Sequence, residues 1–443
     1  MLNVITRMEA VKAMTIPIKD AAFPAPFPSV LEYNAPVRGP WNIVNTGMLV
    51  PQSHQVFVCA QGCLRGVILT AAEMNAMDRM SWVTVDEDDL VDGTMEQDIV
   101  DGTERILRRM GTLPRAVLVF VSCVHLFAGC DVEHAIKELG KRFPEVDFLE
   151  CFMTPTMRKS GLTPDQLTRR QMYCPLRPVT KDPGSVNIIG NDLSIAPSSE
   201  LLSLLHSAFH TVRDITWCRN YEEFLQMAQS SVNLTTHPMA IPAGEELESR
   251  LGQKHLHLPL SYDPMEIIEG YRKLCELAGI SLPDFTQNAE KAEEALHTAK
   301  QIIGDTPITI DYTATPRPLS LARMLLSHGF SVTGLYTDTF LEEDKNDYQW
   351  LKEHHPNLSV TATVAPSMRF AAKGSHQGQL LAIGQKAAYF SGTRHFVNIV
   401  SGGGMYGFDG IVRLAHAMTD ALREEKDTRL VIQRKALGCE SCL

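Results

Sequence analysis

The sequence contains no uncharged apolar run that approaches the roughly 18–20 residues needed to span a bilayer. Its N-terminal segment also lacks the clean apolar core of a secretory signal, because Arg7, Glu9 and Lys12 interrupt it early and Lys19 and Asp20 follow. Both absences predict a cytoplasmic protein without a membrane partner.

The sequence contains fewer basic than acidic residues. The 41 Lys and Arg residues are outnumbered by 52 Asp and Glu residues, which gives a formal net charge of −11. A chain of this sign repels the phosphates of nucleic acids instead of neutralising them, so no nucleic-acid partner is expected. The composition is otherwise that of a soluble globular protein, and 443 residues are enough for two or three domains.

Two common catalytic motifs are missing. The chain has no Gly-x4-Gly-Lys-Ser/Thr loop, which argues against a P-loop ATPase, and no HExxH or other histidine spacing that indicates zinc. His255 and His257 flank one leucine in an alternating strand, and we interpret them as a solvated or subunit-facing pair. The glycine-rich run at 401–404 follows a predicted strand, where it either receives an anion or allows close packing of domains.

Continuous rather than alternating apolar runs mark the predicted strands, as is typical of strands buried on both faces of a parallel sheet. These runs lie at 56–58, 116–121, 186–190, 308–310, 331–336, 358–361 and 396–400. Amphipathic helices are predicted between them at 200–206, 221–230, 264–277, 288–303 and 319–327. The alternation of strand and helix predicts an α/β fold with parallel sheets.

Polar stretches at 177–185 and 304–307 divide the chain into predicted domains. Each of the segments 41–182, 183–305 and 306–430 is long enough for a small doubly wound, Rossmann-like sheet. Residues 1–40 are rich in proline from Pro17 onward and are predicted to form an extended arm over the body or over a partner subunit. Residues 431–443 form a C-terminal tail.

Ten cysteines in a large cytoplasmic chain are not expected to form a disulfide framework, and most should be small buried hydrophobic residues. Cys59 and Cys63 differ, because they follow a predicted strand and open a helix. The N–H groups and dipole of a helix N-terminus favour the thiolate that binds iron. Cys123 and Cys130 follow a second strand end. The four without partner spacing are assigned to the core: Cys151, Cys174, Cys218 and Cys275.

Four cysteines at two successive strand ends match the number that a cubane iron–sulfur cluster requires. The carboxyl ends of parallel strands are also where open α/β sheets bind ligands. Opposing interpretations stay open: a tight strand-to-helix turn with incidental cysteines for Cys59 and Cys63, and a buried apolar cysteine for Cys130. Cys439 and Cys442 form a CxxC near the end of the chain, which is a redox dithiol, half of a metal site or an inert tail.

The order and spacing of these motifs resemble the nitrogenase component 1 superfamily over most of the body of the chain. His54 to Cys63 is similar to the family's His…Gly-Cys segment, whose cysteine binds a cluster at the subunit interface. The other similar segments are EQDIVDGTERIL at 96–107, Ser122-Cys123 with Gly129-Cys130-Asp131, the run from Asp311 to Arg323 with Gly329, and GGMYGFDG at 403–410.

The resemblance implies three Rossmann-like α/β domains and an iron–sulfur cluster, most simply of the 4Fe–4S type. It implies Cys63 and Cys123 as cluster ligands, with Cys59, Cys130 and the terminal CxxC as further candidates. It also implies a homodimer, or a heterodimer with a paralogous chain, and an ATP-dependent iron protein as the electron donor.

Two departures from the family argue against dinitrogen reduction. Residues 33–41 contain no cysteine, although nitrogenase subunits carry a cluster ligand in this region, so a full eight-iron P-cluster is not expected. Tyr406 falls where the family's cofactor-binding histidine lies, and a tyrosine of ordinary pKa does not replace an imidazole ligand. Cys218 falls near the cofactor-binding cysteine, so a second metallocluster is left undefined.

We therefore predict an oxidoreductase, namely the electron-transferring reductase subunit of a two-component system. It would reduce a small molecule other than dinitrogen in the cleft between three domains, near Cys218, His237 and Tyr406. A scaffold or carrier for the assembly of a metallocluster or cofactor is the alternative, and a small-ligand-binding protein without redox chemistry is a third. The catalytic residues are candidates only, and no proton donor is assigned.

Overall fold

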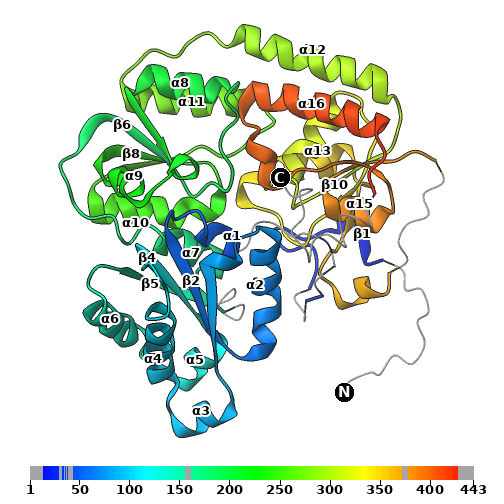
Figure 1. Ribbon diagram of the computed structural model, residues 1–443. Coiled ribbons are helices and arrows are strands. Elements are labelled where there is room, and N and C mark those ends of the chain that lie inside the picture. Colours follow the sequence, from blue (N-terminus) through cyan, green and yellow to red (C-terminus); the bar gives the residue numbers. More distant parts are fainter. Residues whose placement is uncertain are drawn as a thin grey trace.

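The computed structural model describes residues 13–28, 32–33, 35, 37, 43–154, 161–371 and 378–427. Three separate sheets lie in this part of the chain, and helices cover them (Figure 1). None of the helices in these ranges is long and apolar enough to cross a membrane.

The first sheet has four parallel strands in the order β3-β2-β4-β5. Every residue of its two central strands is buried, which is the pattern of strands covered on both faces. The strands are β2 (Ser53–Cys59), β3 (Met80–Thr84), β4 (Ala116–Ser122) and β5 (Asp147–Met153). Its helices are α1 (Ile43–Gly47), α2 (Gln61–Glu73), α3 (Glu87–Asp92), α4 (Met95–Leu107), α5 (Cys123–Ala128), α6 (Val132–Arg142) and α7 (Pro164–Gln171).

The second sheet repeats this topology with the parallel order β7-β6-β8-β9. In each sheet the second strand lies on one side of the first, and the third and fourth strands lie on the other side. The strand order therefore reverses between β2 and β4 and between β6 and β8, and these two places are switch points. The strands are β6 (Asp182–Ile189), β7 (Thr211–Asp214), β8 (Ser230–Thr235) and β9 (Lys254–His257). The helices are α8 (Glu200–Ala208), α9 (Tyr221–Leu225), α10 (Ile241–Leu251) and α11 (Pro264–Ala278).

The third sheet contains five parallel strands, and β1 (Thr15–Pro17) adds an antiparallel edge strand to β12. The part of the proline-rich arm around β1 thus lies on the body of this same chain. The other strands are β10 (Ile308–Asp311), β11 (Val332–Tyr336), β12 (Ser359–Thr361), β13 (Leu381–Ile383) and β14 (His395–Val397). The helices are α12 (Thr286–Ile303), α13 (Pro318–Ser327), α14 (Lys345–His354), α15 (Gln385–Ser391) and α16 (Gly407–Arg423).

One hydrophobic core joins the second and third sheets. Helices α12 and α16 lie side by side along the top of the molecule (Figure 1), and Leu296 of α12 shares this core with Leu414 and Met418 of α16. On one face the first sheet shares a core with elements of the second, including Phe224 of α9 and Leu247 of α10, and on its other face it has a core of its own. The predicted α/β fold with parallel sheets is confirmed.

The glycine-rich run at 401–404 brings the backbone of the third sheet's region against that of the second. Ser401 and the three glycines all have positive φ values, between 50° and 82°. A Cβ on Gly404 would lie 2.3 Å from the carbonyl oxygen of Ser194, and the Gly404 carbonyl accepts a hydrogen bond from the Ala196 amide at 2.9 Å. Of the two interpretations of this run, the geometry favours close packing.

Replacing Gly404 with alanine is expected to lower the free energy of unfolding by about 2–4 kcal/mol. A positive φ costs alanine about 1–2 kcal/mol, and overpacking against a backbone oxygen adds a similar amount. Gly252 is the matched control, because its φ of 68° is close to the 71° of Gly404 but a Cβ there meets no atom within 4 Å. Urea unfolding measures both variants. Equal losses of unfolding free energy would show that the contact with Ser194 adds nothing to the cost of the Gly404 change.

Candidate functional site

Cys63 and Cys123 follow adjacent strands of the first sheet. Val58 of β2 pairs with Val121 of β4, and the helices α2 and α5 begin directly after these two strands. Cys63 lies exposed in the first turn of α2, and Cys123 is the first, partly buried residue of α5. Both therefore lie at the carboxyl edge of the sheet, at its switch point, where open α/β sheets bind their ligands.

Cys59 and Cys130 have different surroundings. The side chain of Cys59 is fully buried in the core with Phe57, and this burial, together with nearby Cys63, raises its pKa to about 12. Cys130 is partly buried, and its pKa is raised by burial and by the charge of Glu96. In both side chains burial disfavours the thiolate form of the metal-free protein. The predicted ligands Cys439 and Cys442 lie outside the described residues.

A buried histidine at this edge was missed by sequence reasoning. His125 of α5 is fully buried, and its Nδ1 accepts a hydrogen bond from the Ser122 amide at 3.3 Å. Its Nε2 has no partner within the part of the chain that the structure describes. Burial lowers its pKa, so the ring is neutral at pH 7. The spacing Ser-x-x-His at a helix start is a capping pattern that would have indicated its position.

No group of three or more His, Cys, Asp or Glu residues suited to a metal ion occurs among the described residues. Cys63 and Cys123 are therefore two potential ligands from one chain, not a complete set.

A second polar site lies at the carboxyl edge of the second sheet. Asp192 follows β6, Asp214 ends β7, and both side chains are almost fully buried. Arg169 of α7 reaches this edge, with its Nη2 2.8 Å from Asp192 Oδ1 and its Nε 2.9 Å from Asp165 Oδ1. The amide of Asn191 donates to both carboxylate oxygens of Asp214 at 3.1 Å.

The two buried carboxyl groups at this edge titrate close to neutral pH. Burial raises the pKa of Asp192 to about 6 although Arg169 opposes the shift, and burial likewise raises the pKa of Asp214 to about 6 against the hydrogen bonds from Thr216. Carboxyl groups perturbed by burial are frequent at functional sites. Sequence reasoning missed both, although they follow strands of the same sheet.

The three predicted catalytic candidates gather at this edge. Cys218 donates its thiol proton to the backbone carbonyl of Asp214, with 3.6 Å between sulfur and oxygen, and burial followed by the charge of Asp214 raises its pKa to about 12. Tyr406, at the start of α16, donates its hydroxyl to Thr236 Oγ1 at 2.8 Å, beside His237. Burial raises the pKa of Tyr406 to about 12. The pKa of His237 lies well below its ordinary value, mainly because the ring is buried and further because of the charges of Arg169 and His257.

These protonation states limit what the candidates can do. The Tyr406 phenol is neutral and already bonded, so it does not act as an anionic ligand at pH 7. His237 is a neutral imidazole whose Nδ1 accepts from the Met239 amide at 3.2 Å. A cavity of about 40 Å³ beside Tyr406, lined also by Leu258 and Tyr271, has space for water.

Comparison with known proteins agrees with this arrangement. The family model for nitrogenase component 1 type oxidoreductases matches residues 45–423. A structure of nitrogenase Cp1 at pH 6.5 has a TM-score of 0.65 at 13% identity and covers 89% of this chain and 95% of its own. A structure of nitrogenase Cp1 at pH 5 has a TM-score of 0.55 at 13% identity, with 90% and 92% covered. No curated protein matches the chain.

At 13% identity the two structures show a shared fold and nothing finer. The family model, in contrast, spans most of the chain and includes the edges of all three sheets. The resemblance inferred from the sequence motifs is confirmed, and this chain belongs to the nitrogenase component 1 type oxidoreductases.

Proposed function

We propose that this chain is the reductase subunit of a nitrogenase-like two-component system and holds an iron–sulfur cluster through Cys63 and Cys123. The observation that carries the proposal is the position of these two cysteines at the switch point of the first sheet, directly after β2 and β4. An ATP-dependent iron protein in the cytoplasm would be the electron donor.

The residues present fit such a cluster when two chains contribute. Cys63 lies exposed at the N-terminus of α2, where a partner chain and a cluster can reach its sulfur. Two cysteines from each of two chains supply the four thiolates of a 4Fe–4S cluster, which when bound transfers single electrons. Exposed apolar side chains flank Cys123 on α5, where Phe127 is 77% exposed and Leu126 38%. A partner copy would cover them.

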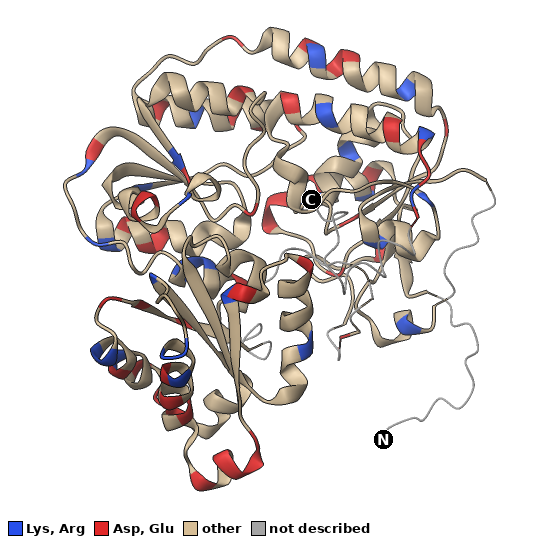
Figure 2. Ribbon diagram, in the orientation of Figure 1, with Lys and Arg blue, Asp and Glu red and all other residues tan. Residues whose placement is uncertain are grey.

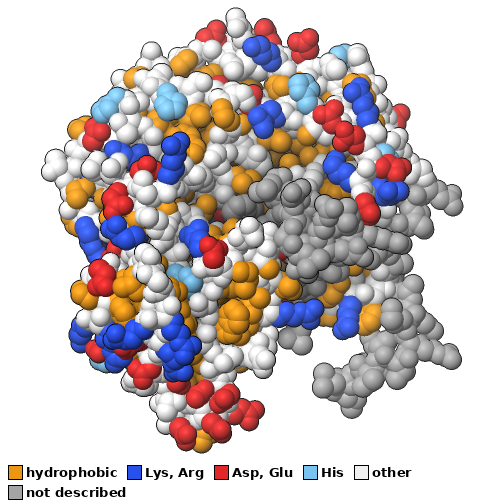
Figure 3. All heavy atoms as spheres, in the orientation of Figure 1, with side chains coloured by type: hydrophobic (Ala, Val, Ile, Leu, Met, Phe, Trp, Pro, Cys, Tyr) orange, Lys and Arg blue, Asp and Glu red, His pale blue; other side chains and the backbone are white. Residues whose placement is uncertain are grey.

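The wider surface of this domain has further features of a contact region. Apolar side chains remain visible on the lower half of the molecule in Figure 3, and the acidic helix α3 forms its lower tip in Figure 2. Trp82 of β3 and Val91 of α3 are also exposed. The partner is either a second copy or a paralogous chain, and an oligomerisation assay on the purified chain distinguishes the two.

The polar edge of the second sheet is the proposed substrate site. Burial raises the pKa values of Asp192 and Asp214 to about 6, and Cys218, His237 and Tyr406 lie around them. A phenol in place of an imidazole ligand at Tyr406 supports a small-molecule substrate other than dinitrogen.

The cysteine assignment predicts the outcome of a metal analysis. Anaerobically purified protein is expected to contain about four irons and four acid-labile sulfides per dimer. Cys63→Ser and Cys123→Ser are each expected to lose most of this iron, because serine is a poor ligand for the cluster. Cys275→Ser is the matched control, since Cys275 is buried in a different core. Equal iron in the wild type and all three variants, or no iron in the wild type after reconstitution, would contradict the proposal.

A scaffold or carrier role is the second candidate. The bonded, neutral phenol of Tyr406 offers no ligand where the family's cofactor histidine falls, which suits temporary holding of a cofactor. A scaffold loses its metal to an apo-acceptor protein, whereas a reductase subunit oxidises a reduced iron protein only with ATP and substrate. Measuring both reactions on one preparation separates the two roles.

A further inference from the structure

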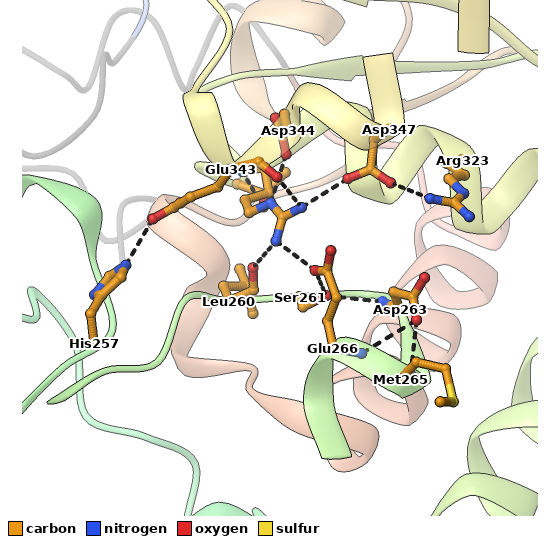
Figure 4. Close-up of polar contacts among 12 residues, drawn as sticks. His257, Leu260, Ser261, Asp263, Met265, Glu266, Arg323, Glu343, Asp344 and Asp347 are labelled. Carbon is orange, nitrogen blue, oxygen red and sulfur yellow. Dashed lines mark hydrogen bonds and ion pairs between the residues drawn. The ribbon is translucent and has the colours of Figure 1, made fainter. Parts of the chain in front are cut away.

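The histidine pair of β9 is partly buried, and it forms part of a continuous hydrogen-bonded chain. Thr235 of β8 lies opposite His257, and its Oγ1 is 2.8 Å from His255 Nε2 and 2.9 Å from His257 Nδ1. On the other side of the ring, His257 Nε2 lies 2.9 Å from Oε1 of Glu343 in η7 (Glu342–Asp344). Figure 4 shows His257 and Glu343 pointing toward each other from different parts of the fold.

The proton positions in this chain follow from its partners. A carboxylate accepts only, so His257 Nε2 carries the proton that faces Glu343. In a neutral ring, Nδ1 then accepts, and its donor is the Thr235 hydroxyl. Because that hydroxyl has a single proton, His255 Nε2 must donate to it. All three hydrogen bonds therefore run in one direction, from His255 to Glu343.

The chain also accommodates a charged His257. When Nδ1 is protonated, the backbone carbonyl of Thr235 accepts from it at 3.1 Å. Nδ1 thus has a donor in the neutral state and an acceptor in the charged state. A ring that exchanges a proton without losing a partner meets the requirement for a transfer intermediate.

We propose that His255, Thr235, His257 and Glu343 form a proton relay along the carboxyl edge of the second sheet, the edge that carries the proposed substrate site, and carry protons for the reduction. This inference rests on the proposed function, because a reductase must add protons along with electrons. It deepens that function by assigning the route of proton delivery, which the sequence left unassigned.

Each transfer step conserves protons and electrons. The His255 imidazolium breaks its Nε2–H bond as Thr235 Oγ1 gains that proton, and the hydroxyl's own proton passes to His257 Nδ1. The Nε2–H bond of His257 then breaks, and an O–H bond forms at Glu343 Oε1. The net change is one proton moved from His255 to Glu343, without an oxidant or reductant.

Both ends of the chain have suitable surroundings. At the outer end, the partly buried ring of His255 packs over Gly244 of α10, where a Cβ would lie 2.3 Å from the ring. At the opposite end, the side chain of Glu343 is 24% exposed, but its Oε2 is buried without a partner among the described residues, and the Glu343 backbone carbonyl accepts from Arg317 at 2.9 Å. Thr236, next to Thr235, binds Tyr406.

Several charged groups surround the chain. Burial lowers the pKa of His255 and the charge of His257 lowers it further, whereas Glu245 and Glu248 of α10 oppose that shift. His257 lies close enough to His237 to lower its pKa as well. Near Glu343, the described charged groups form a cluster around Arg317 that also contains Asp344, Asp347, Glu266 and Arg323.

The test is nuclear magnetic resonance of the full chain labelled with ¹⁵N at the histidine rings, in the absence of any cluster. We expect the neutral His257 ring to be protonated at Nε2. We also expect Thr235→Val, which keeps the β-branched shape, to slow exchange of that proton with water by about tenfold or more. Thr333→Val in β11 is the matched control. It also removes a strand hydroxyl, but this hydroxyl bonds to a backbone carbonyl instead of a histidine.

A second variant guards against a purely structural effect of the valine. Gly244→Ala favours its helix but displaces the His255 ring, so we expect the same slow exchange with the Thr235 hydroxyl intact. A His257 ring protonated at Nδ1 when neutral, or unchanged exchange in both variants, overturns the proposal. Because no cluster is needed, absence of iron in the metal analysis and failure of the proton route are separate results.

Discussion

Replacing Arg317 with methionine is expected to lower the free energy of unfolding by about 3–5 kcal/mol, because it leaves buried carboxylates without their cation. The guanidinium is 2% exposed. Its Nε lies 2.6 Å from Asp344 Oδ1, its Nη2 2.8 Å from Asp347 Oδ2 and its Nη1 2.9 Å from Glu266 Oε2 (Figure 4). Methionine has a similar length but forms none of these ion pairs.

Arg323→Met is the matched control for this loss. Arg323 binds the same Asp347, at 3.0 Å, but its side chain is 31% exposed and pairs with no second carboxylate among the described residues. Asp347 is buried but keeps Arg317 in this variant, so the loss should be close to the value of about 0–1 kcal/mol for a surface pair. Urea unfolding at pH 7 measures both variants without adding salt. Similar losses for the two would mean that burial of Arg317 does not set its contribution.

The Arg317 cluster also bears on the proposed proton route. Glu266 belongs to α11 beside the second sheet, whereas Asp344 and Asp347 belong to the third sheet's region, so Arg317 holds the two together. It also fixes the backbone of Glu343, the last group of that route. Loss of Arg317 should therefore release Glu343 from His257 as well.

The sequence predicted most of the central strands, although β8 and β13 were missed. Runs at 116–121 and 308–310 became β4 and β10 nearly unchanged, because buried strands are continuously apolar. At the edges of the second sheet, the alternating strand at His255 and His257 became β9 (KHLH), whereas β7 (TVRD) was missed because it is short and polar. The helix predicted at 221–230 ends at Leu225, and Ser230 already begins β8.

The candidate site was predictable where it depends on local periodicity. Cys63 and Cys123 share an edge because they follow parallel strands, a rule that needs only the chain order. The burial of Cys59 also follows from alternation along β2, because Phe57 and Cys59 face one core while Val56 and Val58 face the other.

Other parts of the site depend on contacts that no local pattern contains. Arg169 belongs to α7, and its ion pair with Asp192 forms only when that helix packs against the edge of the second sheet. The same holds for Glu343 and His257, which meet across two sheets. Alternation did predict that His255 and His257 face one side, but not that Thr235 and Glu343 cover that side.

Asp344 is expected to make stability fall as the pH rises from about 4 to about 7. Burial raises its pKa to about 7, and the attraction of Arg317 only partly offsets this shift. The folded chain therefore binds the proton more tightly than the unfolded chain, whose carboxyl has an ordinary pKa near 4. Stability from this group is complete below the unfolded pKa and is lost through the folded one, at up to about 1.4 kcal/mol per pH unit.

Asp344→Asn tests this sign, because asparagine resembles the protonated acid and keeps an oxygen for Arg317 Nε. Relative to the wild type, the variant should gain about 3 kcal/mol between pH 5 and pH 8, two of those units lying below the folded pKa. Urea unfolding at both pH values gives the difference. A gap that stays constant with pH would mean that Asp344 is ionised throughout.

The two predictions about this cluster depend on each other. If Asp344 holds its proton at pH 5, then Arg317→Met leaves one less buried charge there than at pH 8. The cost of Arg317→Met should therefore be smaller at the lower pH. For the same reason, Arg317→Met combined with Asp344→Asn should cost less than the sum of the two single changes at pH 8, because residues in one ion-pair network are not additive. Additivity at that pH would mean that Asp344 carries no charge at pH 8 and still holds its proton there.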